Sequence, residues 1–204
     1  MKILYQGNEG AYSQLAAEEI FPQAKLISCK TFENCFKQCA DDENLRTIIP
    51  IENSIAGRVA DIQYLMNKYK LQIYAEHFHK VSHNLMVKPG IKMDDLKYIR
   101  SHSQAISQCQ KLINEYKLEA IIAADTAGSA KYISENSLSD EAAIASTLAA
   151  KKYNLEILKS NIEDDKKNVT RFLFMGRKIE HPEFKKNQNF ITSCIFKVKD
   201  KPAA

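Results

Sequence analysis

Short apolar segments alternate with amphipathic segments from the N-terminus onward, and this alternation restricts the chain to a few folds. Each apolar segment in the first 70 residues is followed by apolar residues spaced like one face of a helix. A repeated strand–helix unit is typical of a parallel sheet covered by helices. The predicted strands are 2–5, 25–28 and 45–51, and the predicted helices are 13–20, 31–40 and 61–69.

The segment 71–87 departs from this pattern, because its apolar residues have no helical period. Extended strands that cross between two lobes would fit it. A second alternating run follows, and 169–175 is a final extended run. The predicted strands of this run are 97–100, 118–124, 142–145 and 155–158, and its predicted helices are 101–116, 125–133 and 146–153.

We therefore predict an α/β protein of two α/β subdomains, joined by crossing segments near 71–87 and 168–175. Residues 1–78 plus 171–180 form the first subdomain and 79–170 the second. Such a hinged pair resembles the type II periplasmic-binding-protein arrangement, with the active site in the cleft between the lobes. Strand C-termini and helix N-termini that line such a cleft suit a small anion.

The composition excludes several other classes. Among 204 residues, 45% are hydrophobic and 26% charged, which is typical of a folded globular chain rather than a fibrous or disordered one. The net charge of +4 is too small and too dispersed for a nucleic-acid surface. No apolar run reaches about 18 residues, and the N-terminus lacks a signal-peptide pattern, so we expect neither a membrane partner nor export.

The five cysteines indicate a reducing compartment, and we expect a cytoplasmic protein. Their number is odd and they contain no Cys-x-x-Cys pair, so a disulfide framework is disfavoured. Cys35 and Cys39 share a helix face with apolar residues, and buried thiols are a better interpretation than metal ligands. We predict no metal and no cofactor.

Two polar loops in the first half follow predicted strands. The first contains Gly7, Gly10 and Ser13, and by itself it is also compatible with a plain turn in which Ser13 caps a helix. The second runs over 50–59 and contains Glu52, Asn53 and Ser54 beside Gly57. Capping by Asn53 or Ser54 is the alternative, but three adjacent polar residues next to a glycine favour a ligand.

Two loops of the second half have the same position relative to strands. Ser101 and Gln104 have capping-box spacing at the start of a predicted helix, whose dipole would favour a carboxylate. His102 between them could be an acid, a donor or an exposed first-turn residue. Asp125 is a natural N-cap, and the small residues after Thr126, including Ala127 and Gly128, would let a ligand or a packed strand approach.

The last loop, 168–172, places Asn168, Thr170 and Arg171 on the predicted strand that recrosses the hinge. Arg171 would be a bidentate clamp for a carboxylate. Its alternative is an ion pair with Asp164 or Asp165. The chain shows no convincing catalytic triad, nucleophile elbow or metal-ligand cluster, so these loops favour electrostatic positioning over covalent catalysis.

Together the five loops resemble the catalytic domain of the prephenate dehydratase family, over roughly residues 2–180. Two positions depart from the family's pattern: Asn8 and Ser103 stand where proline is frequent. The motifs that carry the resemblance are Gly7-x-x-Gly10-Ala11-Tyr12-Ser13, Pro50-Ile51-Glu52-Asn53-Ser54 with Gly57, Ser101-His102-x-Gln104-Ala105 with Gln108-Cys109, Asp125-Thr126-Ala127-Gly128, and Asn168-Val169-Thr170-Arg171-Phe172.

The resemblance implies a carbon–oxygen lyase of phenylalanine biosynthesis. It would convert prephenate, a dianion, to phenylpyruvate, water and CO2 without a cofactor. Thr170 would hydrogen-bond the departing hydroxyl and Arg171 would neutralise a carboxylate. The implied catalytic residues are Thr170, Arg171, Asn53, Ser101 and Gln104, and the implied substrate-binding residues are Ser13, Glu52, Ser54, Gly57, His102, Thr126, Ala127, Asn168 and Phe172.

Family members usually continue into an ACT domain that binds L-phenylalanine. Residues 190–198 resemble its first strand, so 181–204 would be a linker and the start of a truncated ACT domain. Feedback by L-phenylalanine is then expected only where that domain is present. The resemblance also implies a homodimer or higher homo-oligomer.

Two other functions stay open from the residues alone. Arogenate dehydratase applies the same chemistry to the amino analogue, and the loop motifs occur in both groups. A non-catalytic, two-lobed module that binds a small anion would share the fold. Turnover of prephenate and of arogenate separates the three readings.

Overall fold

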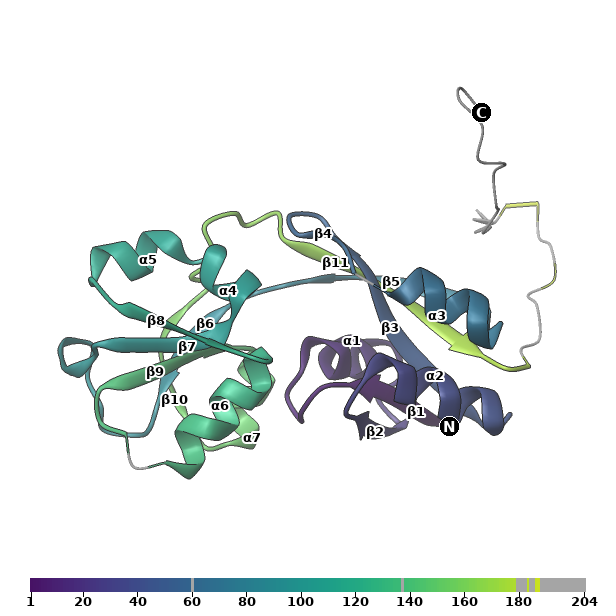
Figure 1. Ribbon diagram of the computed structural model, residues 1–204, viewed down its shortest axis with the longest axis horizontal. Coiled ribbons are helices and arrows are strands. Elements are labelled where there is room, and N and C mark those ends of the chain that lie inside the picture. Colours follow the sequence, from purple (N-terminus) through teal and green to yellow (C-terminus); the bar gives the residue numbers. More distant parts are fainter. Residues whose placement is uncertain (60, 137, 179–182, 184–185, 188–204) are drawn as a thin grey trace, which may run out of the picture.

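Two α/β lobes stand side by side and are linked by two segments in the computed structural model (Figure 1). The structure describes residues 1–59, 61–136, 138–178, 183 and 186–187. The residues predicted to begin an ACT domain, 190–198, lie outside this part of the chain. None of the helices within it is both long and apolar enough to cross a bilayer.

The first lobe contains a sheet in the order β2-β1-β3-β11-β5, with β4 paired to β3. The β1–β2 and β1–β3 pairs are parallel, whereas β11 runs antiparallel to both β3 and β5. The elements are β1 (Lys2–Gln6), α1 (Tyr12–Ile20), β2 (Lys25–Cys29), α2 (Phe32–Asp41), β3 (Leu45–Asn53), β4 (Gly57–Arg58), α3 (Ile62–Tyr69), β5 (Gln72–Lys80) and β11 (Val169–Gly176).

The second lobe contains a mixed sheet in the order β10-β6-β9-β7-β8. Only the β7–β8 and β7–β9 pairs are parallel. The elements are β6 (Asn84–Val87), the 3₁₀ turn η1 (Met93–Asp95), β7 (Tyr98–His102), α4 (Ser103–Ser107), α5 (Gln110–Glu115), β8 (Glu119–Ala123), α6 (Thr126–Glu135), β9 (Glu141–Ala145), α7 (Thr147–Lys152) and β10 (Glu156–Ser160).

Each sheet has an apolar core on both of its faces. In the first lobe, one core packs α2 and α3 against the sheet and another packs α1. In the second lobe, one core is formed with α4 and α5 and the other with α6 and α7. The buried thiols of Cys35 and Cys39 belong to the α2 core, as their shared helix face with apolar residues predicted.

The chain crosses between the lobes at 81–83 and again at 161–168. The first crossing lies inside the predicted segment 71–87. The second crossing, 161–168, lies almost entirely before the predicted segment 168–175. Most of that predicted segment is strand β11, which pairs with β3 and β5 in the sheet of the first lobe. The chain leaves the sheet of the first lobe after Lys80, where β5 ends, and returns to it at Val169, where β11 begins.

The predicted helix 101–116 is wrong. Ser101 and His102 end strand β7, and two short helices follow, with a break at Gln108 and Cys109. The backbone of Asp164 from the second crossing donates to the carbonyl of Gln108 (2.7 Å), and its carboxylate accepts from the N–H of Lys111 (3.2 Å). A distant segment therefore supplies the hydrogen bonds that a continuous helix would have made.

The helix caps agree with the sequence at two positions and differ at two. Asp125 accepts from the N–H of Gly128, as predicted, and Thr31, whose residue type favours this position, accepts from the N–H of Asn34. Ser13 does not cap α1, since Ala11 occupies the N-cap position. His102, not Ser101, caps α4 by accepting from the N–H of Gln104 (3.2 Å).

The loop after β1 reaches across and docks on the second lobe. The Ser146 hydroxyl donates to the carbonyl of Gly10 (2.6 Å), and Asn8 donates to the carboxylate of Asp125 (3.0 Å). Gly10 has φ +89°, and a Cβ there would lie 2.6 Å from Cα of Ala149. Only glycine lets the two lobes approach this closely. The Asn8 side chain supplies a hydrogen bond that a proline at this position could not make.

Candidate functional site

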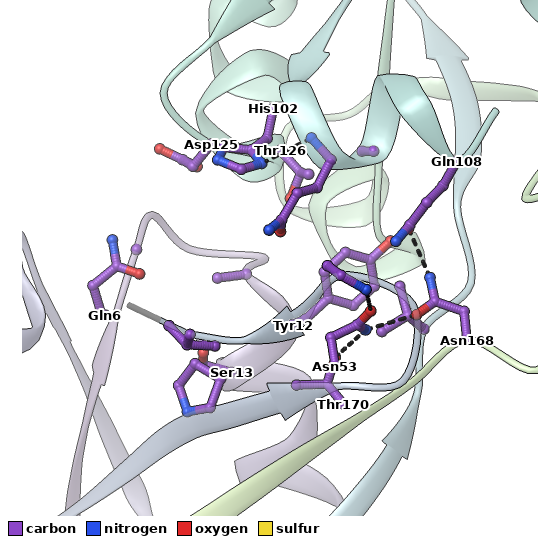
Figure 2. Close-up of a pocket in the computed structure, with 18 of the residues that line it drawn as sticks. Gln6, Tyr12, Ser13, Asn53, His102, Gln108, Asp125, Thr126, Asn168 and Thr170 are labelled. Atoms are coloured by element: carbon purple, nitrogen blue, oxygen red, sulfur yellow. Dashed lines mark hydrogen bonds between the residues drawn. The ribbon is translucent and has the colours of Figure 1, made fainter. Parts of the chain in front are cut away.

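A cavity of about 490 Å³ lies where the two lobes meet. Figure 2 shows His102, Asp125 and Thr126 on one side of it and Gln6 and Ser13 on another. Its walls come from the loops after β1, β3, β7 and β8 and from the start of β11, which are the five polar loops found in the sequence. The tertiary structure thus brings together residues as far apart in the chain as Gln6 and Phe172.

Nine of the fourteen predicted site residues line this cavity. They come from both lobes, and four of them belong to strands or turns of the first lobe next to the crossing. The nine are Ser13, Asn53, Gly57, His102, Gln104, Thr126, Asn168, Thr170 and Phe172.

Four of the other five face elsewhere. The buried Ser101 hydroxyl donates to the carbonyl of Ile144 (2.7 Å), and Ala127 packs in the α6 core. Glu52 is exposed outside the cavity lining. Ser54 donates to the carbonyl of Lys167 (2.9 Å) and accepts from the N–H of Val169 (3.0 Å). Ser54 therefore fastens the start of β11 and does not line the cavity.

Arg171 lies outside the cavity lining as well, for a reason inherent in strand geometry. Successive side chains of β11 alternate between faces, and Thr170 and Phe172 face the cavity. Arg171 instead pairs with Glu76 of β5 at 2.7 Å and 2.8 Å, and it lies over the ring of Phe78. The ion pair considered in the sequence therefore forms with Glu76, not with Asp164 or Asp165.

Arg58 is the cationic side chain that the sequence reasoning overlooked. It lies on the short strand β4 directly after Gly57, it is exposed, and it lines the cavity. Among the described residues no acidic group forms an ion pair with it. The sequence signal that could have identified Arg58 was its position directly after Gly57, a predicted substrate-binding residue. Its guanidinium is therefore free to pair with a carboxylate of a bound ligand.

The side chain of Asn53 has a defined orientation. Its Oδ1 accepts from the backbone N–H groups of Ile55 (3.0 Å) and Ala56 (2.9 Å). Since backbone N–H groups can only donate, the opposite end of the amide must be the donor Nδ2. That nitrogen donates to Asn168 Oδ1 (2.7 Å) and to Thr170 Oγ1 (2.9 Å), the contacts drawn in Figure 2.

This orientation determines what the hydroxyl of Thr170 can do. Its oxygen accepts from Asn53, so its own proton is available for another acceptor. No acceptor for that proton is found among the described residues, and the side chain lines the cavity. Thr170 thus presents a hydrogen-bond donor to a ligand. An amide hydrogen bond to its oxygen also makes that donor stronger, because adjacent hydrogen bonds polarise each other.

The polar chain continues from Asn168 toward the crossing. Asn168, which is fully buried, donates through Nδ2 to Gln108 Oε1 (2.8 Å). That oxygen can only accept, so the contact of His83 Nε2 with it (2.9 Å) makes this nitrogen the protonated one. His83 Nδ1 is then unprotonated, and it shares the single proton of the Tyr12 hydroxyl with the carbonyl of Ser82, each acceptor lying 2.8 Å from that hydroxyl. Burial lowers the pKa of His83 and keeps the imidazole neutral.

Sequence reasoning did not select His83, Gln108 or Tyr12 as site residues, although all three line the cavity. Tyr12 and Gln108 stand inside the motifs that carried the resemblance, which was the available signal. His83 belongs to a segment that was interpreted only as a crossing strand. Its role became visible only when the crossing was placed against α4 and the start of β11.

Two helices direct their first turns toward the cavity. α1 begins at Tyr12 and α6 at Thr126, and Tyr12, Ser13 and Thr126 are lining residues. Within the described part of the chain, no acceptor is found for the N–H groups of Tyr12, Ser13 or Thr126. Such unpaired donors at a helix start bind anions. The group of three metal-ligating side chains found in the described residues lies outside this cavity.

In the described part of the chain, two α/β lobes enclose a cleft that is lined by a polar network around Asn53, by the guanidinium of Arg58 and by two helix N-termini. This arrangement defines a two-lobed α/β protein whose cleft suits a small anion. The prephenate dehydratase family model matches residues 3–180, and the chain belongs to this family. Its two-sheet arrangement agrees with solved structures of the family and confirms the predicted fold class.

The relatives include both substrate groups. Arogenate dehydratase 2 of Petunia hybrida is 37% identical over 99% of this chain and 51% of its own length. A bifunctional N-acyl-homoserine lactone acylase/prephenate dehydratase of Komagataeibacter europaeus is 36% identical over 99% of this chain and 72% of its own. The chain thus spans about half the length of several curated relatives that it matches.

Solved structures superimpose closely on this fold. The prephenate dehydratase of Arthrobacter aurescens, in complex with L-Phe, has a TM-score of 0.84 at 26% identity and covers 91% of this chain and 62% of its own. The enzyme of Staphylococcus aureus has a TM-score of 0.77 at 26% identity and covers 89% of this chain and 68% of its own.

Proposed function

We propose that this chain converts prephenate to phenylpyruvate, water and CO2. The observation that carries the proposal is the donor geometry at Thr170, whose hydroxyl proton is left free by Asn53 and faces the cavity. A reaction that expels a hydroxyl group needs a donor at that oxygen. The family and the relatives' names support prephenate or its amino analogue as the ligand.

Two bonds break in this reaction. The bond between the ring and its carboxylate releases CO2, and its electron pair completes the aromatic ring. The bond to the ring hydroxyl breaks with its electron pair on oxygen, which takes one proton from solvent and leaves as water. Thr170 donates a hydrogen bond to that oxygen as charge develops on it, and Asn53 holds Thr170 in place.

The carboxylates of the substrate are held by groups that the cavity offers without a metal. Arg58 supplies the positive charge, and the first turns of α1 and α6 supply free N–H donors. Gln104 and His102 add side-chain donors at the start of α4. In this proposal Arg171 acts through the sheet: its ion pair with Glu76 ties β11 to β5 beside Thr170.

Turnover of prephenate by the purified chain tests the proposal directly. We expect Thr170→Val to lower kcat by about 10²–10⁴-fold, the usual contribution of a positioned proton donor, and Thr170→Ser to keep part of the activity. Binding of prephenate without release of phenylpyruvate would favour the non-catalytic binding module. Wild-type kcat in Thr170→Val would remove the hydroxyl from the mechanism.

Arogenate is the second candidate substrate, because several relatives are named arogenate dehydratases. The two substrates differ by an amino group in place of a keto group on the side chain. A ratio of kcat/KM values measured on both substrates assigns the preference. The donor geometry at Thr170 serves either substrate, since the departing hydroxyl is the same.

The partners and the compartment follow as further parts of this proposal. We place the chain in a reducing, cytoplasmic compartment, supported by the four cysteines among the described residues, which are all buried and free. We propose a homodimer or higher homo-oligomer, because symmetric pairs dominate among oligomers. Sedimentation of the purified chain measures its assembly. L-phenylalanine is proposed as an effector only where an ACT domain follows.

A further inference from the structure

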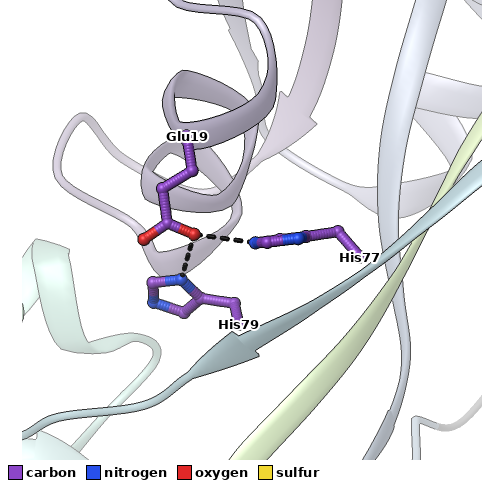
Figure 3. A group of neighbouring side chains, drawn as sticks. All are labelled: Glu19, His77 and His79. Carbon is purple, nitrogen blue, oxygen red and sulfur yellow. Dashed lines mark hydrogen bonds and ion pairs between the residues drawn. The ribbon is translucent and has the colours of Figure 1, made fainter.

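A second polar cluster lies away from the cavity, between helix α1 and strand β5. It consists of Glu19, His77 and His79, and Figure 3 shows both imidazoles directed at the carboxylate. None of the three side chains lines the cavity. The prephenate dehydratase chemistry proposed above makes no use of them.

The three ligand atoms already converge. Glu19 Oε2 lies 2.7 Å from His77 Nε2 and 3.0 Å from His79 Nδ1, and all three atoms lie within 4.8 Å of one another. The strand spacing explains the pair of imidazoles, because residues two apart on β5 point to the same face. Glu19 sits in the last turns of α1, which packs over that face.

The carboxylate of Glu19 is the anionic member of the cluster. Burial raises the pKa of the Glu19 carboxyl, but the hydrogen bonds from His79 and His77 outweigh it and hold this pKa below its usual value. The carboxylate is therefore ionised at neutral pH. The His79 side chain is 8% exposed and that of Glu19 is 47% exposed, so the cluster is anchored at one end and open to solvent at the other.

We propose that Glu19, His77 and His79 form a binding site for a divalent transition-metal ion such as Zn²⁺. Two imidazole nitrogens and one carboxylate oxygen are the ligands that such ions prefer, at about 2.0–2.2 Å. Ligands at that distance in tetrahedral geometry lie about 3.3–3.5 Å apart, so a small outward shift of the carboxylate admits the ion. Water completes the coordination on the exposed side.

Bound metal would act on the structure rather than on the substrate. It would join α1 to β5, and α1 carries Tyr12 and Ser13 at its other end. β5 in turn pairs His79 with Thr170 of β11. The ion would thus stabilise the contact between α1 and β5 next to the strand that carries Thr170. We expect its main effect to be a higher melting temperature.

Calorimetric titration with Zn²⁺ tests the site on the whole chain. We expect one ion per chain, and we expect His77→Gln and Glu19→Gln each to weaken binding at least tenfold. Glu18→Gln is the matched control, because Glu18 is the neighbouring carboxylate on α1 and accepts from Gln14 instead of the imidazoles. Zn²⁺ should raise the melting temperature of the wild type and of Glu18→Gln, but not of His77→Gln.

A Co²⁺ titration distinguishes this site from the buried thiols. We expect visible d–d absorption without the intense near-ultraviolet band of a cobalt–thiolate bond. A thiolate band, or equal Zn²⁺ affinity in the wild type and both ligand variants, would overturn the proposal, as would absence of binding. His77 is partly exposed, so unchanged melting of His77→Gln in the absence of metal shows that loss of binding is not loss of folding.

Discussion

Asn53→Asp is the substitution that tests the donor geometry most directly, because it changes one NH₂ group to an oxygen. The two backbone N–H groups of Ile55 and Ala56 keep an acceptor, so the turn after β3 stays intact. The other carboxylate oxygen, however, can only accept. It therefore accepts a hydrogen bond from the Thr170 hydroxyl, which then has no free O–H to donate to the departing hydroxyl of the substrate.

The expected decreases in kcat and in folding stability follow from the hydrogen bonds that are lost at Thr170 and at Asn168. Removal of one preorganised donor at a site of developing charge costs about 10²–10³ in kcat, or about 2.7–4 kcal/mol of barrier. The contact of Asn53 Nδ2 with Asn168 Oδ1 (2.7 Å) also becomes a repulsion between two acceptors. A lost hydrogen bond of this kind costs about 0.5–1.5 kcal/mol of folding stability. KM should change little, since Arg58 and the helix N-termini hold the carboxylates.

Steady-state formation of phenylpyruvate from prephenate gives kcat and KM, and thermal unfolding gives the stability. Ser54→Ala is the matched control, because Ser54 fastens β11 from the same turn without lining the cavity. It should lower the melting temperature while kcat stays within about threefold of wild type. Near-native kcat in a folded Asn53→Asp protein would refute the argument that the direction of the Asn53–Thr170 hydrogen bond matters.

Three other perturbations probe separate parts of the site. Arg58→Gln should raise KM for prephenate by about tenfold or more while kcat falls less, because a charge-assisted hydrogen bond to a carboxylate contributes about 1.5–3 kcal/mol; an unchanged KM would contradict this role. Gly10→Ala should separate the lobes near Ala149 and lower both kcat and the melting temperature, whereas a wild-type melting curve would show that the lobes do not need this contact. The pKa of His83 is lowered in the folded chain, so the unfolded chain binds a proton more readily below about pH 6.5, and the free energy of unfolding should decrease as the pH is lowered through that range. His83→Gln should reduce this dependence of the unfolding free energy on pH, as measured by urea titrations at several pH values. An equal dependence in both proteins would exclude His83 as its cause.

Local sequence patterns predicted much of the fold. The alternation of strand and helix signals predicted two α/β units, and residues such as Thr31 and Asp125 cap helices as their types suggest. These features depend on neighbours a few residues away, so the chain determines them locally. The predicted helix 101–116 failed because Asp164, more than 50 residues further on, supplies partners that split it.

The motifs located the cavity, but they could not say which side chains enter it. Arg171 stands inside a motif and yet pairs with Glu76, since strand alternation turns it away once Thr170 faces the cavity. Ser101 is likewise directed into the second lobe by the carbonyl of Ile144. Arg58 and His83 enter the cavity because of a strand pairing and a crossing that no local pattern specifies.

The sequence by itself determined the layered architecture and the set of polar loops, because periodicity and capping are properties of neighbouring residues. Only the tertiary structure decided the direction of each hydrogen bond around Thr170. Two backbone N–H groups orient Asn53, and Asn53 orients both Thr170 and Asn168. These residues are up to 117 positions apart. A donor can be assigned only when its partners are in contact, and folding alone brings them there.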